Sequence, residues 1–384
     1  MTTIAAAVAA DITRHGPQPV DRLLERALYD EADGFYEAGG RAGGRHGDFL
    51  TSPEVGPLFG AVVAHALDGW WQQMGEPDPF VVVEAGAGPG TLCRTVLAAG
   101  PACARALRYV LVERSAAQRS LQAATLPLEE PALAFAPVDP DTESPVAGAP
   151  AGPICVSLAA LPRVAGPVVV LANELLDNLP FAVAERGTDG WAEVRVDLDP
   201  AAAAGGAVRL VERLVPLDAE RRAVLDRLAP GAAPGARVPW QAAARSWLRE
   251  ALAVAGRGGR VVVVDYAATT AELADRPQAG WLRTYRGHAR GGGLLVDLGG
   301  QDVTAEVATD QLALVRPATH DTSQADWLRV HGLDDLVADG RRTWSERAHI
   351  GDLAALAARS RVREAEALVD PAGLGAFRVL EWSG

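Results

Sequence analysis

The stretch Phe80-Val81-Val82-Val83-Glu84-Ala85-Gly86-Ala87-Gly88-Pro89-Gly90-Thr91 decides the fold. Its first four residues are large and apolar, which is typical of a strand buried on both faces of a parallel sheet. An acidic residue and three alternate glycines follow. Glycines allow a sharp turn and let a ligand lie against bare backbone. Because ligands of open α/β sheets bind beyond the carboxyl ends of such strands, the stretch predicts a nucleotide-type site.

The glycine spacing indicates which nucleotide binds. A dinucleotide fingerprint has a third small residue where this chain has Thr91, which disfavours a dehydrogenase. The pattern is instead E-x-G-x-G-x-G, the form associated with S-adenosyl-L-methionine enzymes of the Rossmann-like class. We expect Glu84 to anchor the cationic amino-acid end of that cofactor, directly or through water. The predicted cofactor loop consists of Gly86, Gly88, Gly90 and Thr91.

Other strands supply further cofactor candidates. A second predicted strand, 109–112, ends at Glu113, where a carboxylate can accept both ribose hydroxyls. The alternative for Glu84 and Glu113 is an ordinary strand-to-helix turn with a capping acid. A third strand predicted over 132–136 places Asp139 where an acid often meets the adenine amino group.

Composition restricts the class of protein. The chain has 384 residues, 49% of them apolar, and no uninterrupted apolar run near 18 residues, so we expect a soluble globule with no membrane partner. A net charge of −13 opposes nonspecific nucleic-acid binding. Three scattered cysteines without a C-x-x-C pair, and histidines without H-E-x-x-H spacing, predict a reduced, cytoplasmic protein without a metal site. The amino terminus lacks the basic region of a signal peptide.

The first part of the chain predicts a cover for the cofactor. Residues 1–30 have helical spacing, and a glycine-rich loop over 39–47 leads to Asp48 and Thr51. Pro53 then marks the start of a helix that we expect to run through Trp71. Because a helix N-terminus offers free N–H groups, this loop is predicted to cover the cofactor, with Asp48 and Thr51 as contacts.

The later chain completes an α/β fold. After a fourth strand at 168–172, period-two alternation around Asp189-Gly190 predicts a β-hairpin within an inserted β/α segment. A fifth strand follows at 260–266. An outer strand near 312–315 and a closing strand at 377–380 are expected to form an antiparallel pair, and helices are expected at 324–331 and 350–358.

We therefore predict a Rossmann-like α/β protein with a mostly parallel seven-stranded sheet and helices on both faces. Its expected parts are an N-terminal helical extension with the covering loop (1–79), a cofactor-binding core (80–180), an inserted β/α substrate subdomain (181–256) and the remainder of the core (257–384).

Ordered sequence blocks over roughly residues 29–305 resemble the MidA-type methyltransferases. The blocks are Tyr29-Asp30, Gly34-Phe35-Tyr36, Gly47-Asp48-Phe49-Leu50-Thr51-Ser52-Pro53-Glu54-Val55, Phe59-Gly60, the glycine stretch from Glu84 to Leu92, Ala172-Asn173-Glu174-Leu175-Leu176-Asp177-Asn178-Leu179-Pro180, Val264-Asp265-Tyr266, Leu282-Arg283-Thr284-Tyr285-Arg286-Gly287-His288 and Gln301-Asp302-Val303-Thr304-Ala305. This family includes a mitochondrial assembly factor that methylates an arginine of a respiratory complex I subunit. The resemblance implies S-adenosyl-L-methionine as cofactor and an arginine-bearing protein as substrate.

This chain departs from the family pattern at three places. Leu175-Leu176 replaces the usual pair of phenylalanines, Ala267 stands where glycine is common, and the usual acid is not evident around 237–239. These differences leave cofactor binding intact and weaken the transfer of substrate identity.

Two acids after the fourth strand are the leading catalytic candidates. Glu174 and Asp177 are expected at the edge of the sheet, and i, i+3 spacing in a helical turn would place them on one face. Two carboxylates can grip a guanidinium, orient one nitrogen toward the methyl group and stabilise the cation. Asn173 is a candidate cofactor contact, and the alternative for Asn173-Glu174 is helix capping within a packed turn.

Three further residues are candidates for catalysis. Glu54 is either a third carboxylate at the site or a first-turn acid favoured by the helix dipole. Tyr285 and His288 follow the fifth strand, where they would form a pocket lid or assist proton removal. A lone histidine is more often structural.

Three functions remain open from the sequence. The first is a protein-arginine methyltransferase that acts by in-line transfer, and the second is a small-molecule N- or O-methyltransferase on the same scaffold. The third is a cofactor-binding assembly factor whose main task is to hold a partner protein. The sequence does not fix the oligomeric state.

Overall fold

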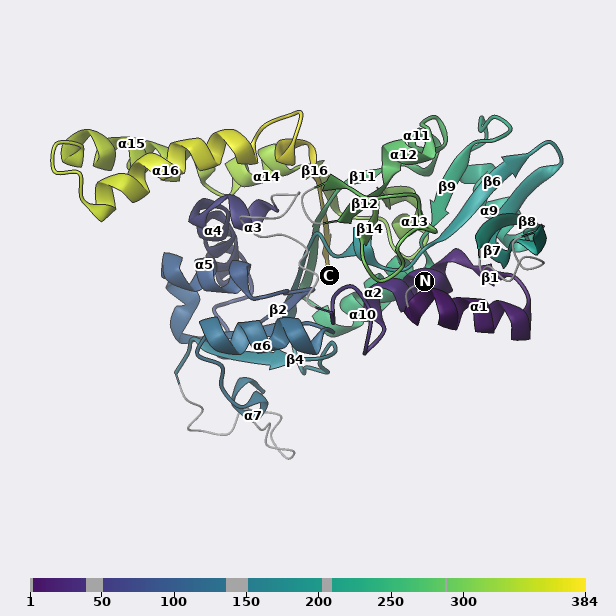
Figure 1. Cartoon of the computed structure of the whole chain (residues 1–384). Helices are drawn as coiled ribbons and strands as arrows, with labels where there is room; N and C mark the ends of the chain where they lie inside the picture. Colours follow the sequence, from purple (N-terminus) through teal and green to yellow (C-terminus); the bar gives the residue numbers. More distant parts are fainter. Residues whose placement is uncertain (1–2, 39–50, 136–150, 202–208, 287–288) are drawn as a thin grey trace.

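The computed structural model describes residues 3–38, 51–135, 151–201, 209–286 and 289–384. Within these ranges the strands form a seven-stranded sheet, a five-stranded sheet and two small sheets of three and two strands. Figure 1 shows the larger sheet at the centre of the molecule, with the five-stranded sheet to one side and a helical hairpin projecting on the other.

The seven-stranded sheet carries five of the predicted strands. In order across the sheet these are β16 (His320–Ser323), β17 (Arg378–Ser383), β10 (Arg260–Asp265), β5 (Val168–Asn173), β2 (Phe80–Ala85), β3 (Leu107–Val112) and β4 (Ile154–Leu158). The last five run parallel, β17 runs antiparallel to β10, and β16 runs antiparallel to β17. The predicted mostly parallel Rossmann-like sheet is therefore confirmed, and its last two strands are antiparallel, although the outer one is not at the predicted residues.

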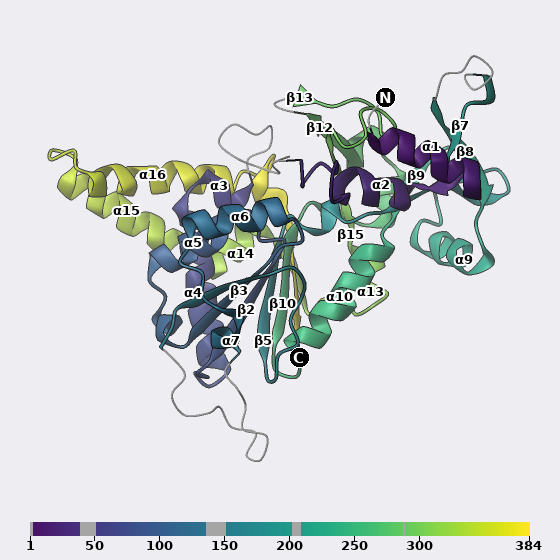
Figure 2. The same cartoon turned by 60° about the horizontal axis from the view of Figure 1, so that its bottom comes forward.

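Helices cover both faces of this sheet. Those that pack on it or connect its strands are α3 (Ser52–Val55), α4 (Pro57–Gln73), α5 (Thr91–Ala99), α6 (Ala116–Thr125), α7 (Pro131–Ala134), α10 (Ala242–Ala255), α13 (Thr309–Ala313), α14 (Gln324–Val330), α15 (Leu333–Arg347) and α16 (Leu353–Leu368). Phe80 and Val82 of β2 pack in the layer of α4 and α5, whereas Val81 and Val83 pack in the layer of α10. Figure 2 separates these layers on opposite sides of the strands. Burial on both faces explains the continuous apolar run of β2.

The predicted helix from Thr51 through Trp71 is interrupted at Gly56. A Cβ atom at Gly56 would lie 2.2 Å from the carboxyl carbon of Glu364 on α16, so a larger residue here would displace that carboxylate. The buried Glu364 carboxylate accepts a hydrogen bond of 2.9 Å from the N–H of Leu58 in the first turn of α4. The interruption therefore lets Glu364 of α16 cap the N-terminus of α4. The positive end of the helix dipole stabilises a negative charge at this place.

The five-stranded sheet joins the N-terminal region to the inserted segment. Its strands are β1 (Gln18–Pro19), β7 (Gly190–Leu198), β6 (Ala182–Gly187), β9 (Arg237–Trp240) and β8 (Leu210–Pro216), and the helices around it are α1 (Thr3–His15), α2 (Val20–Tyr29) and α9 (Ala219–Leu228). β6 and β7 form the predicted hairpin, which is confirmed. One buried core contains Ile4 of α1, Leu23 and Leu28 of α2, and Trp191 of β7. Helices α1 and α2 therefore pack on this sheet.

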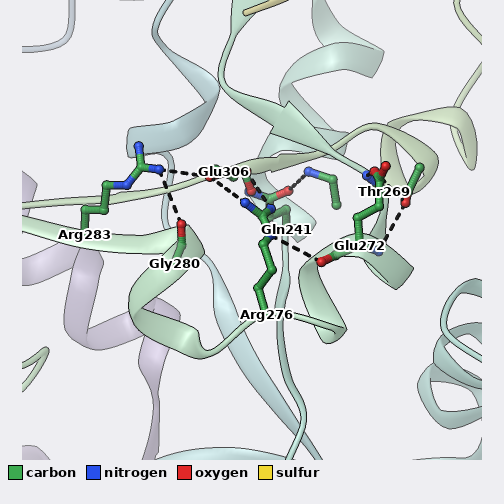
Figure 3. A network of polar contacts seen from close by, with 8 residues as sticks. Gln241, Thr269, Glu272, Arg276, Gly280, Arg283 and Glu306 are labelled. Atoms are coloured by element: carbon green, nitrogen blue, oxygen red, sulfur yellow. Dashed lines mark hydrogen bonds and ion pairs between the residues drawn. The ribbon is translucent and has the colours of Figure 1, made fainter. Parts of the chain in front are cut away.

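A charged network lies beside the start of α10. The short elements here are β11 (Ala267–Ala268), β15 (Val307–Ala308), β12 (Leu282–Arg286), β13 (Ala289–Arg290), β14 (Asp302–Ala305), α11 (Thr270–Ala274) and α12 (Gln278–Trp281). The carboxylate of Glu306 accepts hydrogen bonds from Arg276 at 2.7 and 3.1 Å and from Arg283 at 3.1 Å, as Figure 3 shows. The side chain of Gln241 donates to the Glu306 carbonyl at 3.1 Å. Two arginines on one half-buried acid thus hold these connections together, and Gln241 attaches them to the start of α10.

Two predicted strands are wrong. Residues 132–136 were expected as the third strand, but Pro131–Ala134 forms helix α7, and the strand is β4 (Ile154–Leu158). Proline at the first helical position favours the helix. Residues 312–315 were expected as the outer strand, but Thr309–Ala313 is helix α13, and β16 takes the outer position. β16 is polar because a strand at the sheet edge faces solvent.

The connection between β16 and β17 is far longer than an antiparallel pair needs. It contains α14, α15 and α16, and the last two form a hairpin whose bases contact α3 and α4. The predicted helix at 324–331 corresponds to α14 and the one at 350–358 to the start of α16, whereas α15 was not predicted. Both views show the hairpin extending away from the sheet.

Candidate active site

A cavity of about 460 Å³ lies at the carboxyl ends of β2, β3 and β5, the point where the strand order reverses. Many of the predicted site residues line it. They are Thr51, Glu54, Glu84, Gly86, Gly88, Thr91, Glu113, Asn173 and Glu174. Gly90, Asp177 and Tyr285 are described but do not line the cavity. Asp48, Asp139 and His288 lie outside the described residues.

The glycine loop has the backbone that the sequence pattern requires. Gly86, Gly88 and Gly90 have φ angles of 68°, 50° and 82°, in the left-handed region that favours glycine. A Cβ atom at Gly88 would meet nothing within 4 Å and would enter the cavity that this residue lines. A Cβ atom at Gly90 would lie 2.7 Å from Leu126. Gly88 therefore keeps the cavity open, and Gly90 allows the loop to pack on α6.

Glu113 is held at the cavity wall by backbone donors. Its carboxylate accepts hydrogen bonds from the N–H of Gly88 at 2.9 Å and of Ser115 at 2.8 Å. Burial raises the pKa of Glu113, while these two donors act in the opposite direction. Each carboxylate oxygen retains acceptor capacity, so the group can also receive the hydroxyls of a ribose.

Glu84 lies deeper in the same wall. It is 4% exposed, and its carboxylate accepts a hydrogen bond of 2.7 Å from the hydroxyl of Tyr109. Burial raises the pKa of Glu84 to about 7, and the bond from Tyr109 partly offsets that rise. A cationic ammonium group in the cavity would stabilise the ionised form of Glu84.

Glu174 lies at the end of the cavity opposite Glu113. Its φ angle of 50° is left-handed, so the chain turns sharply after β5 instead of starting a helix at this residue. The carboxylate accepts hydrogen bonds from the N–H of Ser52 at 3.2 Å and from the side-chain amide of Asn173 at 3.1 Å. Burial and the nearby Asp265 raise the pKa of Glu174 to about 8. Among the described residues the buried side-chain oxygen of Asn173, at the cavity wall, has no hydrogen-bond partner.

Asp177 lies behind this wall, where its side chain is 4% exposed. The predicted helical turn with Glu174 and Asp177 on one face does not form, because the 3-10 turn η2 (Leu176–Asn178) starts only after Glu174. Asp265 of β10 accepts hydrogen bonds from the N–H of Leu176 at 2.9 Å and of Asp177 at 3.3 Å. Burial and the Asp265 carboxylate raise the pKa of Asp177 well above its usual range. The carboxyl groups of Asp177 and Asp265 are thus buried close together.

Thr51 and Glu54 form a capping box at the start of α3, in which the N–H of Thr51 donates to the Glu54 carboxylate at 3.3 Å. Both residues line the cavity beside Glu174. Glu54 therefore has both roles that its sequence position allowed, since it caps the helix and also contributes a carboxylate to the cavity.

Tyr285 lies on β12 and is half-buried away from the cavity. Burial raises the pKa of its hydroxyl.

A network missed by the sequence reasoning closes one side of the cavity. Tyr29, Tyr36 and Asn178 line it. The carboxylate of Asp302 accepts hydrogen bonds from the Tyr36 hydroxyl at 3.0 Å and from the Asn178 amide at 3.1 Å, and the Tyr29 hydroxyl donates to the carbonyl of Asn178 at 3.1 Å. The signal was present, because these four residues all fall in the sequence blocks quoted above.

The cavity wall after β4 differs from the expectation for an adenine site. Ala159, Ala160 and Leu161 follow this strand and line the cavity, together with Trp247 and Glu250 of α10. An acid predicted after the third strand was placed at Asp139 from a strand over 132–136 that does not exist. The wall at this point is formed by apolar residues from the β4 loop and by an acid from a different helix.

The arrangement fits S-adenosyl-L-methionine. Gly88 leaves a space that a side chain would fill, Glu113 presents acceptors suited to a ribose, and Glu84 and the unpartnered oxygen of Asn173 suit an ammonium group. Among the described residues no cluster of three or more histidine, cysteine or acidic side chains is arranged to hold a metal ion, and none of the described helices is long and apolar enough to cross a membrane. The fold and the site together define the Rossmann-like methyltransferase class.

Comparison with known proteins gives the family. Residues 62–326 match the family described as putative S-adenosyl-L-methionine-dependent methyltransferases. The match covers well over half of the chain, and the chain belongs to this family. The predicted family and cofactor are therefore confirmed.

Two kinds of relatives agree with this result. The mouse mitochondrial protein arginine methyltransferase NDUFAF7 is 30% identical over 308 residues, which are 76% of this chain and 64% of the relative. The human protein of the same name is 32% identical over 196 residues, or 48% of this chain and 43% of the relative. This chain thus spans less than two thirds of these relatives. A Burkholderia thailandensis protein solved with S-adenosyl-homocysteine bound is 28% identical with a TM-score of 0.77, over 99% of this chain and 92% of that one.

Proposed function

We propose that this chain transfers a methyl group from S-adenosyl-L-methionine to the guanidinium of an arginine in a partner protein. The observation that carries the proposal is the excess of buried carboxylates at the end of the cavity opposite Glu113. In the described chain Glu174 is contacted by the N–H of Ser52 and the amide of Asn173, and neither group is a cation. Buried carboxylates without a cation are costly, so this end is suited to a cationic guest.

Arginine suits this site better than a neutral acceptor. A planar guanidinium stays charged and presents several N–H donors in a fixed geometry that matches carboxylates. Glu174 and Glu54 both line the cavity, so we assign the carboxylate pair to these two residues, in place of Glu174 and Asp177. The mouse and human relatives are named protein arginine methyltransferases, which supports the same acceptor.

The residues of the chain account for the steps of transfer. When bound, S-adenosyl-L-methionine supplies an electrophilic methyl group on a sulfonium. Glu174 and Glu54 accept hydrogen bonds from the guanidinium and orient one nitrogen toward that methyl group. As the N–C bond forms and the S–C bond breaks, the carboxylates stabilise the cation, and Glu174 then accepts the proton that the nitrogen releases. The pKa of Glu174 is about 8 without a cation, and a bound guanidinium lowers it, so that Glu174 is ionised when the arginine is in place.

Asp265 is proposed to act as a positioning residue for the acidic end. Its carboxylate fixes the turn after Glu174 through the N–H groups of Leu176 and Asp177. We also propose that the segment 181–256 forms the substrate-binding part, because α10 of this segment contributes Trp247 and Glu250 to the cavity wall. A protein partner and a cytoplasmic location are part of the proposal, although the curated relatives are named mitochondrial.

Quantitative mass spectrometry of methylarginine tests the proposal. Cells that lack the gene are compared with cells complemented by the wild-type chain or by the E174Q variant. We expect one or a few arginine sites to lose methylation without the gene, to regain it with the wild type and not to regain it with E174Q. Labelled donor that appears only in small molecules would instead identify a small-molecule methyltransferase. Full cellular function of a variant that no longer binds cofactor would identify an assembly factor.

A further inference from the structure

The hairpin of α15 and α16 ends in an apolar tip. Ile350, Leu353 and Leu356 are 56%, 84% and 52% exposed, and they follow one another across the turn between the two helices. Leu353 and Leu356 lie three residues apart on α16, so they share a face of that helix. Three bulky apolar side chains gathered at the end of a projecting hairpin indicate a binding surface.

Charge is distributed unevenly along the hairpin. Its distal part, residues 341–359, holds four arginines against Glu346 and Asp352, a net charge of +2 in a chain of net charge −13. The base has the opposite character, because Asp334 and Asp335 in the first turn of α15 and Glu366 near the end of α16 are exposed acids. The hairpin is therefore basic toward its tip and acidic at its base.

Another exposed apolar residue lies at the base of the hairpin. Val330, the last residue of α14, is 79% exposed directly before α15 begins. An apolar group thus stands at each end of the hairpin, which is about 20 Å long at 1.5 Å per helical residue.

We propose that the hairpin is the interface of a homodimer, in which the hairpins of two copies pack side by side and antiparallel about a two-fold axis. In this arrangement the tip leucines of each copy meet Val330 of the other, and the basic distal part of each meets the acidic base of the other. A two-fold interface must be self-complementary. The apolar residues at the tip and the base, and the basic tip with the acidic base, satisfy that condition. Packing tip to tip would instead place the two distal segments, each of net charge +2, against each other.

The base of the hairpin connects this interface to the cavity. Glu364 of α16 caps α4 through Leu58, and α16 also contacts α3, which contains the cavity residues Pro53 and Glu54. Dimerisation therefore supports the helices that form one wall of the cavity, although neither subunit contributes a residue to the cavity of the other.

Sedimentation velocity of the full chain tests the dimer. We expect the wild type to be dimeric and L353E to raise the dimer dissociation constant at least tenfold, about 1.4 kcal/mol. The control is L314E, at a residue 45% exposed on a different part of the chain, which should leave the dimer unchanged. Because Leu353 is exposed, L353E should fold normally, which circular dichroism checks. A monomeric wild type, or an L353E variant as dimeric as the wild type, would overturn the proposal.

Cross-linking tests the antiparallel arrangement. The native cysteines are buried, so V330C and L353C chains can be joined selectively by a short bismaleimide. A mixture of V330C and L353C chains should give a cross-linked dimer, and neither variant alone should. Efficient cross-linking of L353C alone would show tip-to-tip packing and contradict the proposal. A monomeric wild type that sediments with phosphatidylserine vesicles through the same leucines would assign the tip to a membrane surface instead.

Discussion

The two ends of the cavity hold their carboxylates in different ways. Glu113 receives two backbone N–H groups, and Glu84 receives the hydroxyl of Tyr109. At the other end burial and the Asp265 carboxylate raise the pKa values of both Glu174 and Asp177. Glu113, which has fixed donors, is suited to the neutral hydroxyls of a ribose, and Glu84 is suited to the ammonium group of the cofactor. A group of crowded carboxylates gains most from a cation, which is why we assign the cofactor to the first end and the guanidinium to the second.

The largest expected effect comes from blocking the cofactor end alone. In a G88V variant the side chain would enter the cavity, so we expect S-adenosylhomocysteine binding to become undetectable by calorimetry. The left-handed φ of 50° adds a folding cost of about 1–2 kcal/mol. The matched control is G100V, whose φ of 67° and empty surroundings are similar but which is not at the cavity. It should lose comparable stability and bind normally, and equal binding by both variants would contradict the assignment.

The next effect comes from changing the acidic end alone. E174Q keeps an oxygen that can accept from Ser52 and Asn173 but loses the charge. We expect kcat for arginine methylation to fall by roughly 10²–10³-fold, as for loss of one charge-stabilising group, while S-adenosylhomocysteine affinity changes little. Steady-state kinetics and calorimetry separate the two.

A stability measurement distinguishes this role of Glu174 from a structural one. Because E174Q removes one buried acid from a crowded group, it should unfold at a temperature equal to or higher than the wild type at pH 8.5. A variant that loses both stability and cofactor affinity would mean that Glu174 mainly holds the turn together.

The local sequence was sufficient for the cofactor end but not for the acidic end. A strand buried on both faces leaves a continuous apolar run, so Phe80–Ala85 and the acid and glycines after it were recognisable. Whether Glu174 and Asp177 share a face depends on a left-handed φ and on hydrogen bonds to Asp265, 88 and 89 residues away in sequence. Such long-range contacts leave no periodic signal.

Two other features were hidden for related reasons. The contact between Tyr36 and Asp302 spans 266 residues, so neither residue could be assigned to the cavity from its neighbours in sequence. β16 consists of polar residues because it lies at an edge, and an apolar segment at 312–315 was therefore preferred wrongly. The mostly parallel sheet and the family were predictable, whereas edge strands and the walls of the site required the fold.

The contrast between the two ends also predicts how stability depends on pH. Burial raises the pKa of Glu84 to about 7, of Asp265 to about 7 and of Glu174 to about 8, whereas the same groups in the unfolded chain titrate near 4. Between about pH 4 and pH 8 the folded chain binds more protons than the unfolded chain, so the free energy of unfolding falls as pH rises.

Urea unfolding at pH 5.5 and pH 8.5 measures this slope. The wild type should be more stable at the lower pH, and E174Q should have a shallower slope, because one of the raised groups is gone. A wild-type stability that increases over this range would show that these carboxylates are ionised in the folded chain. The acidic end would then already be compensated before any cation binds.

The smallest effect is expected where an acid at the cofactor end loses its fixed donor. Y109F removes the hydroxyl that donates to Glu84 at 2.7 Å, without changing the buried ring. We expect a loss of about 1–3 kcal/mol in the free energy of unfolding, because the Glu84 oxygen is left without its partner. S-adenosylhomocysteine affinity should fall by severalfold, since the pKa of Glu84 rises further and less of it is ionised at neutral pH.

If this explanation is right, raising the pH to 8.5 restores most of the affinity of Y109F, because Glu84 then ionises without help from the hydroxyl. An affinity deficit that is the same at pH 6.5 and pH 8.5 would mean instead that Tyr109 acts by shaping the wall, and that Glu84 is not the group that receives the ammonium.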